Sequence, residues 1–224
     1  MRKWYVLLFC LFWGMNAHAA QMYGERICKQ SRYLCHKVQA HESWSGLFPD
    51  DDERDLVKRL NRMNIPLRRG MVIAIPKELG SLDLMDISPF PESISAPGTS
   101  TIQVDQDKLA WGAYDSGGRL VNWGPISAGK SYCPDIKSAC RTVKGKFTIY
   151  RKQGEGCVSS RFPRPHGGAK MPFCMHFFKG FALHGSYTVP GRNDSHGCVR
   201  MFVQDAEWLN QNFIKVGVTK VLIR

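Results

Sequence analysis

From residue 101 onward, short apolar stretches alternate with Gly, Pro and Ser, which is the pattern of a mainly β domain. The predicted strands are TIQVD (101–105), LAWGAY (109–114), RLVNWGPISAG (119–129), GKFTIYR (145–151), FFKGFALHG (177–185) and VTKVLI (218–223). One helix is predicted from Gln204 to Phe213, because Ala206, Leu209 and Phe213 share a helical face and acidic residues stand in the first turn. We therefore expect a mixed β-sandwich or barrel-like domain over residues 101–224, with a helix near its C-terminus.

The front segment, residues 22–76, has its own pattern. It predicts a strand over 35–39, a short helical turn over 43–48, a helix over 50–63 and a second strand over 71–75. Leu56, Leu60 and Met63 fall on one face of the longer helix, and Asp50 can cap it. Residues 77–100 are rich in Pro, Ser and Gly without sustained periodicity, which predicts a linker.

The N-terminus is predicted to be a cleaved secretory signal, residues 1–19. Arg2 and Lys3 precede an apolar stretch of 12 residues, and Ala17-His18-Ala19 follows. That stretch is shorter than the roughly 20 residues of a membrane span. We expect a protein without a transmembrane span, secreted across the inner membrane into the periplasm or cell envelope.

The net charge of the chain limits the classes of binding partner that we expect. The formal net charge is +12, and removal of the two signal cations leaves 12 − 2 = +10. Such a chain favours polyanions, but the basic residues are scattered, and neither a recognition-helix nor a zinc-finger spacing appears. An anionic envelope polymer fits better than nucleic acid.

The number of cysteines indicates that one thiol is unpaired. Cys10 lies in the signal, where the bulky neighbours argue against lipid attachment, and seven cysteines remain. An odd number in an oxidising compartment leaves one thiol free or paired between molecules. Local closure favours Cys28 with Cys35, Cys133 with Cys140, and Cys157 with Cys174, although seven cysteines allow 105 arrangements and the six can also be small buried hydrophobes. Cys198 is then the free thiol.

The stretch ALHGSYTVPGRNDSHGCVRM, residues 182–201, surrounds that thiol with candidate chemistry. A thiol attacks as thiolate, so it needs a base, room for a substrate and donors for the charge that develops. His184, His196, Gly197 and Cys198 can supply these. The alternative is an ordinary buried or disulfide-bonded cysteine.

Residues 22–76 resemble the LysM family of glycan-binding modules. HESWSGLF (41–48) and especially LNRMNIPLRRGMVIAIP (60–76) carry the likeness, within the order strand, helix, helix, strand. Two features depart from the family: His41-Glu42 replaces the usual Gly-Asp, and an acidic run stands between the helices. A prodomain of the same topology without a ligand is the alternative.

Residues 101–224 resemble the L,D-transpeptidase catalytic domain of the YkuD type. The likeness rests on SHGCVR (195–200) after a His-Gly pair, on RTVKGKFTIYR (141–151), on MPFCMHFFKGFALHG (171–185) and on DAEWLN (205–210). Val143 and Lys144 replace the usual Pro and Thr, the gap between His184 and Ser195 is short, and Arg200 stands where others have Asn. These departures bear on substrate preference.

The resemblance implies a peptidoglycan L,D-transpeptidase without a cofactor or metal. Cys198 is the implied nucleophile, His184 the base and the Gly185 carbonyl the group that orients it. The backbone N–H groups of Gly197 and Cys198, with His196 contributing, are the implied oxyanion donors. Ser195 and Arg200 are the predicted substrate-binding residues, because Arg200 shares the face of Cys198 if the segment is extended. The implied partners are stem peptides, glycan strands and, as one acceptor, a lipoprotein.

Several alternatives stay open at this point. His196 can be only a turn residue, and Arg200 a solvated charge or the partner of Asp205. A zinc site from His184, His196 and Cys198 has proper ligand types but no fourth ligand. His166 and His176 are interpreted as loop and strand residues. A papain-type protease is disfavoured because His184 precedes Cys198, and the competing functions are a non-catalytic peptidoglycan-binding protein or a carboxypeptidase that uses water.

Overall fold

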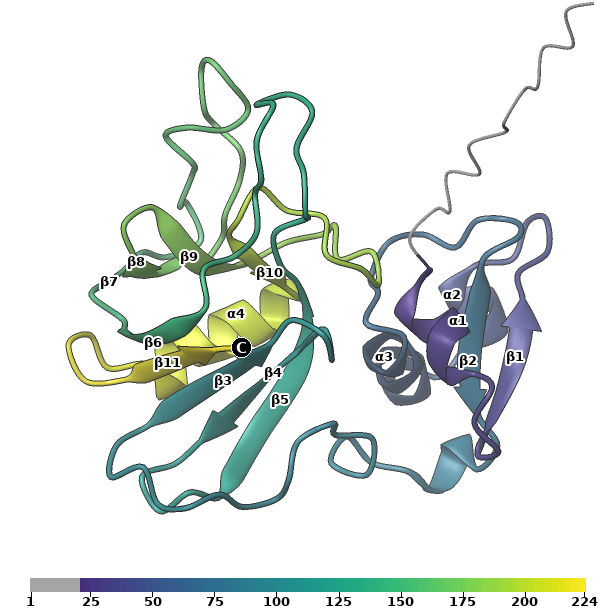
Figure 1. The fold of residues 1–224 in the computed structure, drawn as a ribbon. Coiled ribbons are helices and arrows are strands. Elements are labelled where there is room, and N and C mark those ends of the chain that lie inside the picture. The colour runs from purple at the N-terminus through teal and green to yellow at the C-terminus, as the bar shows by residue number, and fades with distance from the viewer. Residues whose placement is uncertain (1–20) are drawn as a thin grey trace, which may run out of the picture.

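The structure is a computed structural model that describes residues 21–224. The predicted signal, residues 1–19, lies outside the described residues. The N-terminal module, which we define as residues 21–76, consists of α1 (Tyr23–Ile27), β1 (Tyr33–Lys37), α2 (Trp44–Leu47), α3 (Asp51–Leu60) and β2 (Val72–Pro76) (Figure 1). Strands β1 and β2 pair antiparallel.

The predicted order of strand, helix, helix and strand is found in this module, with α1 added in front. Five residues are too few for a helical period to show in the sequence, so α1 was not predicted. Asp50 caps α3 as expected, because its Oδ1 accepts hydrogen bonds from the N–H groups of Asp52 and Glu53 at 3.0 and 2.9 Å. The helix ends at Leu60 instead of Met63, and Arg62 has a left-handed φ of 56°.

Nine strands form the sheet of the second body. They are β3 (Thr101–Asp105), β4 (Ala110–Tyr114), β5 (Leu120–Ser127), β6 (Gly145–Thr148), β7 (Arg151–Lys152), β8 (Met175–Phe178), β9 (Phe181–Gly185), β10 (Val199–Met201) and β11 (Lys220–Ile223). Their spatial order is β6-β11-β3-β4-β5-β10-β9-β8-β7. The pairs β11/β3 and β10/β9 are parallel and the others antiparallel, so the sheet is mixed.

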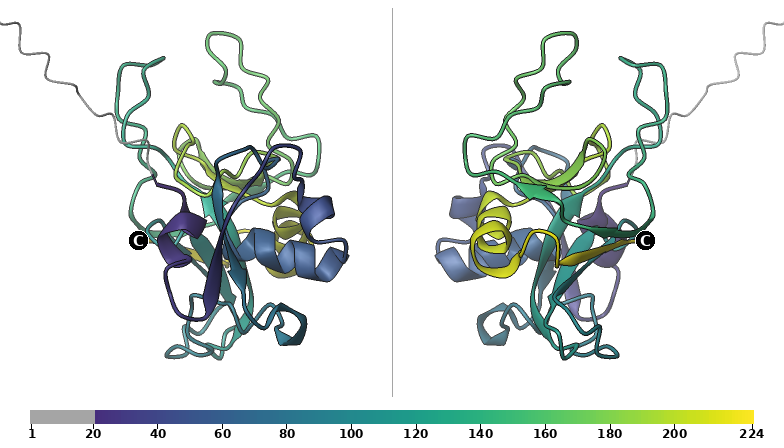
Figure 2. Two further views of the ribbon diagram at one scale, coloured as in Figure 1. Left: turned by 90° about the vertical axis from the view of Figure 1, so that its right-hand side faces the viewer. Right: turned by 90° about the vertical axis from the view of Figure 1, so that its left-hand side faces the viewer.

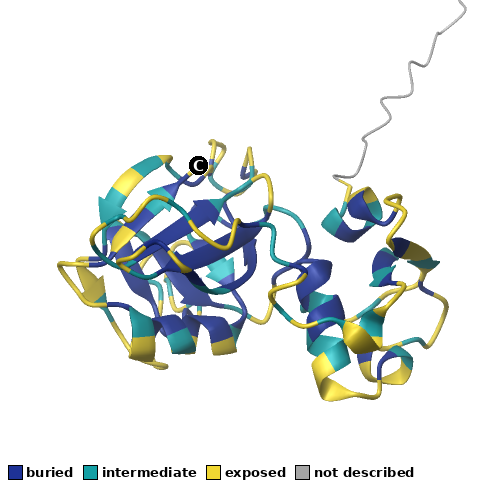
Figure 3. Cartoon of the chain, turned by 90° about the horizontal axis from the view of Figure 1, so that it is seen from below, coloured by how far each residue is buried: buried dark blue, intermediate teal, exposed yellow. Residues whose placement is uncertain are grey.

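The sheet curls until its two edges meet. The edge strands β6 and β7 are separated in the chain only by Ile149 and Tyr150. The N–H of Ile149 donates to the carbonyl of Thr219, and that of Tyr150 to the carbonyl of His176, each at 3.0 Å. The buried residues of the main core lie along the strands of this sheet, many of which are dark blue in Figure 3. The prediction of a mainly β domain is confirmed, as one strongly curled sheet with few helices.

Three predicted elements differ in more than their exact ends. GKFTIYR (145–151), predicted as one strand, forms β6 and β7 at opposite edges of the sheet. FFKGFALHG folds as the hairpin β8/β9 instead of one strand, and its turn places Lys179 in the left-handed region with a φ of 46°. The predicted helix begins one residue earlier, as α4 (Val203–Trp208), and continues as a π-helical segment, η2 (Leu209–Phe213). The π-helical turn is only slightly wider than an α-helical turn, so the spacing of apolar residues in 204–213 does not distinguish the two.

The segment 77–100, predicted as a linker, packs against the second body. It contains the short 3₁₀ helix η1 (Leu79–Ser81), and Ile87 and Phe90 are buried. The indole Nε1 of Trp123 donates to the carbonyl of Leu84 at 2.7 Å. The segment therefore connects the two bodies as packed chain.

A buried ion pair joins the N-terminal module to the second body. Arg59 of α3 donates to both carboxylate oxygens of Asp205 in α4, at 2.7 and 3.0 Å, and both side chains are buried. Removing one partner of such a pair typically costs about 3–5 kcal/mol. No helix within residues 21–224 is long and apolar enough to cross a membrane.

Candidate active site

A cavity of about 440 Å³ opens beside strands β8, β9 and β10. Two long loops, 130–144 in teal and 153–174 in green, project on this side of the sheet (Figure 2). Five of the seven predicted site residues line the cavity: Cys198, His184, His196, Ser195 and Arg200. Gly185 and Gly197 do not line the cavity, but their backbones form hydrogen bonds with His184 and Ser195, which do.

Strand alternation explains why these side chains gather. Leu183 and Val199 are fully buried in the main core, so their neighbours in β9 and β10 project from the opposite face. His184 and Arg200 are direct partners in the parallel pair β9/β10. The extended segment after Cys198 therefore places Arg200 beside the predicted base.

The cysteines follow the predicted local pairs. The bridges are Cys28–Cys35, Cys133–Cys140 and Cys157–Cys174. Cys198 is the one free cysteine of the described residues, and it is partly exposed.

The thiol of Cys198 is protonated at rest. Its Sγ lies 3.8 Å from the carbonyl oxygen of Gly180, to which the thiol donates. Burial raises the pKa of this thiol, against the opposing effects of a backbone hydrogen bond with Ala182 and the positive charge of Arg200.

His184 is buried and neutral. Its Nδ1 lies 2.9 Å from the carbonyl oxygen of Gly185, and because a carbonyl only accepts, Nδ1 carries the proton. The lone pair is then on Nε2. Burial lowers the pKa of His184 to about 4, with smaller contributions from the charges of Arg200 and His176 and an opposing one from the Gly185 hydrogen bond. The ring is a neutral base with one free nitrogen.

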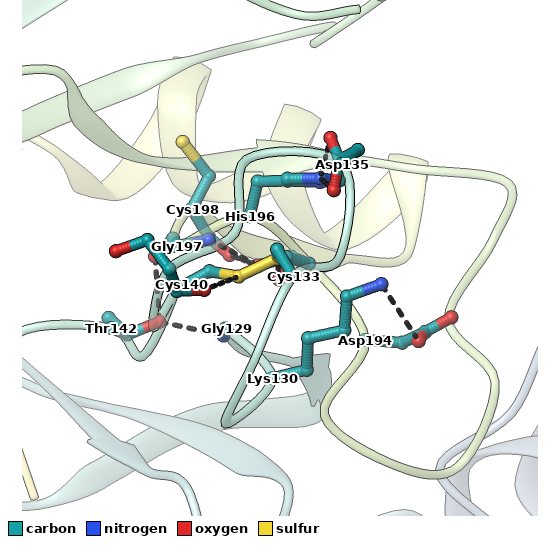
Figure 4. Close-up of a disulfide and its surroundings, with 12 residues drawn as sticks. Gly129, Lys130, Cys133, Asp135, Cys140, Thr142, Asp194, His196, Gly197 and Cys198 are labelled. Atoms are coloured by element: carbon teal, nitrogen blue, oxygen red, sulfur yellow. Dashed lines mark hydrogen bonds and ion pairs between the residues drawn. A yellow bond between two sulfur atoms is a disulfide. The ribbon is translucent and has the colours of Figure 1, made fainter.

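The turn before the nucleophile is held by side-chain oxygens. Ser195 Oγ accepts from the N–H of Gly197 at 3.0 Å and donates to the carbonyl of Cys198. Thr142 Oγ1 donates to the carbonyl of Gly197 at 2.7 Å (Figure 4). Gly197 has a φ of 120°, and a Cβ there would meet the Phe181 ring at 2.8 Å, so glycine is required.

The hydrogen bonds of this turn bear on the predicted oxyanion donors. The N–H of Gly197 is already used by Ser195 Oγ, so it does not face the cavity as a free donor. Within residues 21–224, the backbone N–H groups of His196 and Cys198 have no internal hydrogen-bond acceptor. The hydroxyl of Ser195, a predicted substrate-binding residue, is likewise engaged within the turn, by Gly197 and Cys198.

The imidazole of His196 points away from the thiol. Its Nε2 lies 2.8 Å from a carboxylate oxygen of Asp135, and its ring packs on Phe162 with centroids 4.7 Å apart. Figure 4 shows the His196 ring directed toward Asp135 while the Sγ of Cys198 projects elsewhere. The hydrogen bond from His196 holds the pKa of Asp135 below its usual range. Asp135 lies in the loop closed by Cys133 and Cys140, where no sequence pattern marked it.

The zinc site that stood as an alternative can be compared with the ligand-type clusters of the structure. In the described part of the chain, the ligand-type clusters are Cys157–Cys174–His176 and Cys133–Asp135–His196, and the cysteines of both are in disulfides. The trio of His184, His196 and Cys198 is not among these clusters. The alternative partner of Arg200 is also wrong, since Asp205 pairs with Arg59.

His176 also belongs to the cavity, which its sequence context did not indicate. His176 is a strand residue of β8, as predicted, but it also lines the cavity. Its Nε2 lies 3.0 Å from the guanidinium of Arg151, which can only donate, so the proton is on Nδ1. Burial and the charge of Arg151 lower the pKa of His176. His166 lies in an exposed turn of the 153–174 loop, as predicted.

The cavity lining is cationic. Arg151, Arg161, Lys170, Lys179 and Arg200 line it, and none of the described lining residues is acidic. Arg200 is partly buried and makes no ion pair within 4.0 Å among the described residues. An anionic ligand would find an unneutralised guanidinium beside the thiol.

The family follows from comparison with known proteins. Residues 99–223 match the YkuD family, described as the L,D-transpeptidase catalytic domain, and this is more than half of the 224 residues. The chain therefore belongs to the YkuD family of L,D-transpeptidase catalytic domains. A search of curated proteins found no match.

The fold is shared with a solved L,D-transpeptidase, and two further solved structures are similar over part of the chain. An L,D-transpeptidase from Xylanimonas cellulosilytica DSM 15894 is 23% identical with a TM-score of 0.55, and the match covers 76% of this chain and 78% of that one. An L,D-transpeptidase from Stackebrandtia nassauensis is 20% identical, with a TM-score of 0.47 and coverage of 61% and 60%. One from Mycobacterium tuberculosis H37Rv is 16% identical, with a TM-score of 0.45 and coverage of 56% and 57%.

Proposed function

We propose that this protein is a peptidoglycan L,D-transpeptidase that uses Cys198 as its nucleophile. The observation that carries the proposal is that Cys198, the one free thiol among residues 21–224, shares a cavity with a neutral, buried His184 whose Nδ1 is held by the Gly185 carbonyl. This arrangement leaves Nε2 as the proton acceptor.

The first half-reaction forms an acyl-enzyme. His184 Nε2 takes the thiol proton of Cys198, and the thiolate attacks the carbonyl of the third residue of a stem tetrapeptide, typically diaminopimelate. The tetrahedral intermediate collapses when the bond to the terminal D-Ala breaks, and His184 returns the proton to the leaving amine. Because both resting groups are neutral, the transfer occurs when the substrate is in place.

Charge stabilisation comes from the turn and the strand. The N–H groups of His196 and Cys198 are the free donors for the oxyanion, and loss of one such donor typically costs about 2.7–4 kcal/mol. Arg200 binds a substrate carboxylate, which neutralises its partly buried charge.

The second half-reaction transfers the acyl group to an amine. The side-chain amine of another stem attacks the thioester, gives its proton to His184, and Cys198 is regenerated as a thiol. The same acyl-enzyme serves a lipoprotein lysine or water, so the acceptor decides between crosslinking, attachment and trimming.

We also propose that residues 22–76 are a LysM-like glycan-binding module. The support is the β1, α2, α3, β2 order and the 60–76 segment that carries the likeness. Three disulfides favour an oxidising compartment such as the periplasm, in line with the predicted signal.

The test uses the mature chain, from residue 20 or 21 onward, with a stem tetrapeptide. We expect D-Ala release with a covalent mass increase at Cys198, and none of either with Cys198→Ala. A matched control is Cys28→Ala with Cys35→Ala, which removes a remote disulfide and leaves the adduct intact. D-Ala release that survives Cys198→Ala would refute the proposal, and mass spectrometry of digested sacculi then identifies the acceptor.

A further inference from the structure

We propose that Asn64 of the N-terminal module is a positioning residue of the catalytic cavity. Through this side chain the module holds the segment Ser186–Val189, which forms one wall of the cavity. The inference rests on the proposed function, and it gives the module a task inside the site beside any binding of glycan.

Asn64 binds this segment through both ends of its side-chain amide and through its backbone N–H. Its Nδ2 donates to the carbonyl of Ser186 at 2.8 Å, and its Oδ1 accepts from the N–H of Val189 at 2.8 Å. Its backbone N–H donates to the carbonyl of Val189 at 3.0 Å. These bonds join residues more than 120 positions apart in the chain.

The segment that Asn64 binds lies directly beside the reacting groups. Ser186 and Thr188 line the cavity, and Ser186 follows Gly185, whose carbonyl holds His184. On its other side the segment is bound by the sheet, since the N–H of Ser186 donates to the carbonyl of Met201 at 2.8 Å. Asn64 therefore holds this wall from the side of the module, and Met201 holds it from the side of the sheet.

The module itself is fixed to the catalytic domain at this place. Met63 bridges Pro190, and the N–H of Tyr23 donates to the carbonyl of Gly191 at 2.9 Å. The buried Arg59–Asp205 pair anchors α3 to α4. A side chain in a loop that these contacts fix in place can hold a wall, whereas one on a mobile tether cannot.

The experiment uses Asn64→Asp in the full mature chain with a soluble stem tetrapeptide that carries no glycan. A carboxylate keeps the acceptor for Val189 but sets a negative oxygen against the Ser186 carbonyl. We expect kcat/KM at least tenfold below wild type at neutral pH. The ratio of variant to wild type should recover as the pH falls, because a protonated carboxyl again offers one donor and one acceptor.

The matched control is Asn61→Asp, three residues earlier. The Asn61 amide bonds only within the module, to Val57 and Ala74. This variant should lower the thermal midpoint and leave kcat/KM unchanged below the transition. A ratio near one for Asn64→Asp, or equal losses in both variants with no pH recovery, would overturn the inference.

Amide hydrogen exchange separates this inference from the proposed function. Asn64→Ala, which removes the Oδ1 acceptor of the Val189 N–H, should speed exchange at Val189 even if wild type fails to turn over the tetrapeptide, in which case the proposed function alone is refuted. Unchanged exchange at Val189 overturns the positioning role.

Discussion

His184 and His196 lie on the same cavity and differ in almost every physical respect. His184 projects from a strand, is buried, and has a backbone carbonyl as its partner. His196 stands in a turn, is partly exposed, and has the carboxylate of Asp135 as its partner. The backbone carbonyl fixes the proton of His184 on Nδ1 and leaves Nε2 as a free acceptor, whereas Nε2 of His196 is engaged by the carboxylate. Burial and the hydrogen-bond partner, rather than the residue type, distinguish the proposed base from its neighbour.

The largest effect should come from removing each imidazole in turn. We expect His184→Gln to slow acylation of Cys198 by about 10²–10⁴-fold, the usual contribution of a general base. His196→Gln should cost much less, because its ring points to Asp135. The rate of covalent mass increase at Cys198 measures acylation in both variants. Equal losses would contradict the proposal that His184 alone is the base.

The second effect concerns stability in acid. The pKa of His184 is about 4 in the folded chain and about 6.5 when exposed, so between these values the unfolded chain binds a proton that the folded chain does not. Stability should therefore fall as the pH falls from about 6.5 to about 4, by roughly 3 kcal/mol from this residue. Above pH 6.5 the residue contributes no slope.

Urea unfolding at pH 7 and pH 4.5 measures this window. His184→Gln should lose part of the acid destabilisation that wild type shows, since glutamine does not titrate. Between pH 7 and pH 8 His184→Gln and wild type should show the same dependence of stability on pH, which is the internal control. If His184→Gln keeps the whole acid destabilisation of wild type, burial of His184 is not its cause.

The smallest effect should come from Asp135. Asp135→Asn keeps a hydrogen-bond acceptor for His196 and removes the charge, and partly exposed ion pairs contribute little. We expect a change of less than about tenfold in acylation. Kinetics at low and high salt check it, and a loss as large as that of His184→Gln would place His196 among the catalytic groups.

The local parts of this molecule could be predicted from its sequence. The apolar alternation of TIQVD and the heptad-like spacing in 204–213 arise from neighbours in the chain, and so do the three disulfides, which close over 7, 7 and 17 residues. The SHGCVR motif identified the thiol and the family. Each of these signals lies within about twenty residues.

The contacts that could not be predicted join distant segments. Asp135 meets His196 across 61 residues, and Arg59 meets Asp205 across 146. Nothing around either residue distinguishes it from a solvated charge until the fold brings the partner near. The hydrogen bond of the Gly197 N–H could not be predicted either, because its acceptor belongs to a rotatable Ser195 side chain.

The meeting of β6 and β7 has a consequence for how this domain behaves at high concentration. Sheet edges are templates for pairing with another chain, and proteins protect them by shortening or covering them. Here both edges of the nine-stranded sheet are short, of four and two residues, and one turn of the chain at Ile149 and Tyr150 ties them together. The curl that shapes the cavity thus also removes the long open edge from which aggregation by strand addition would start.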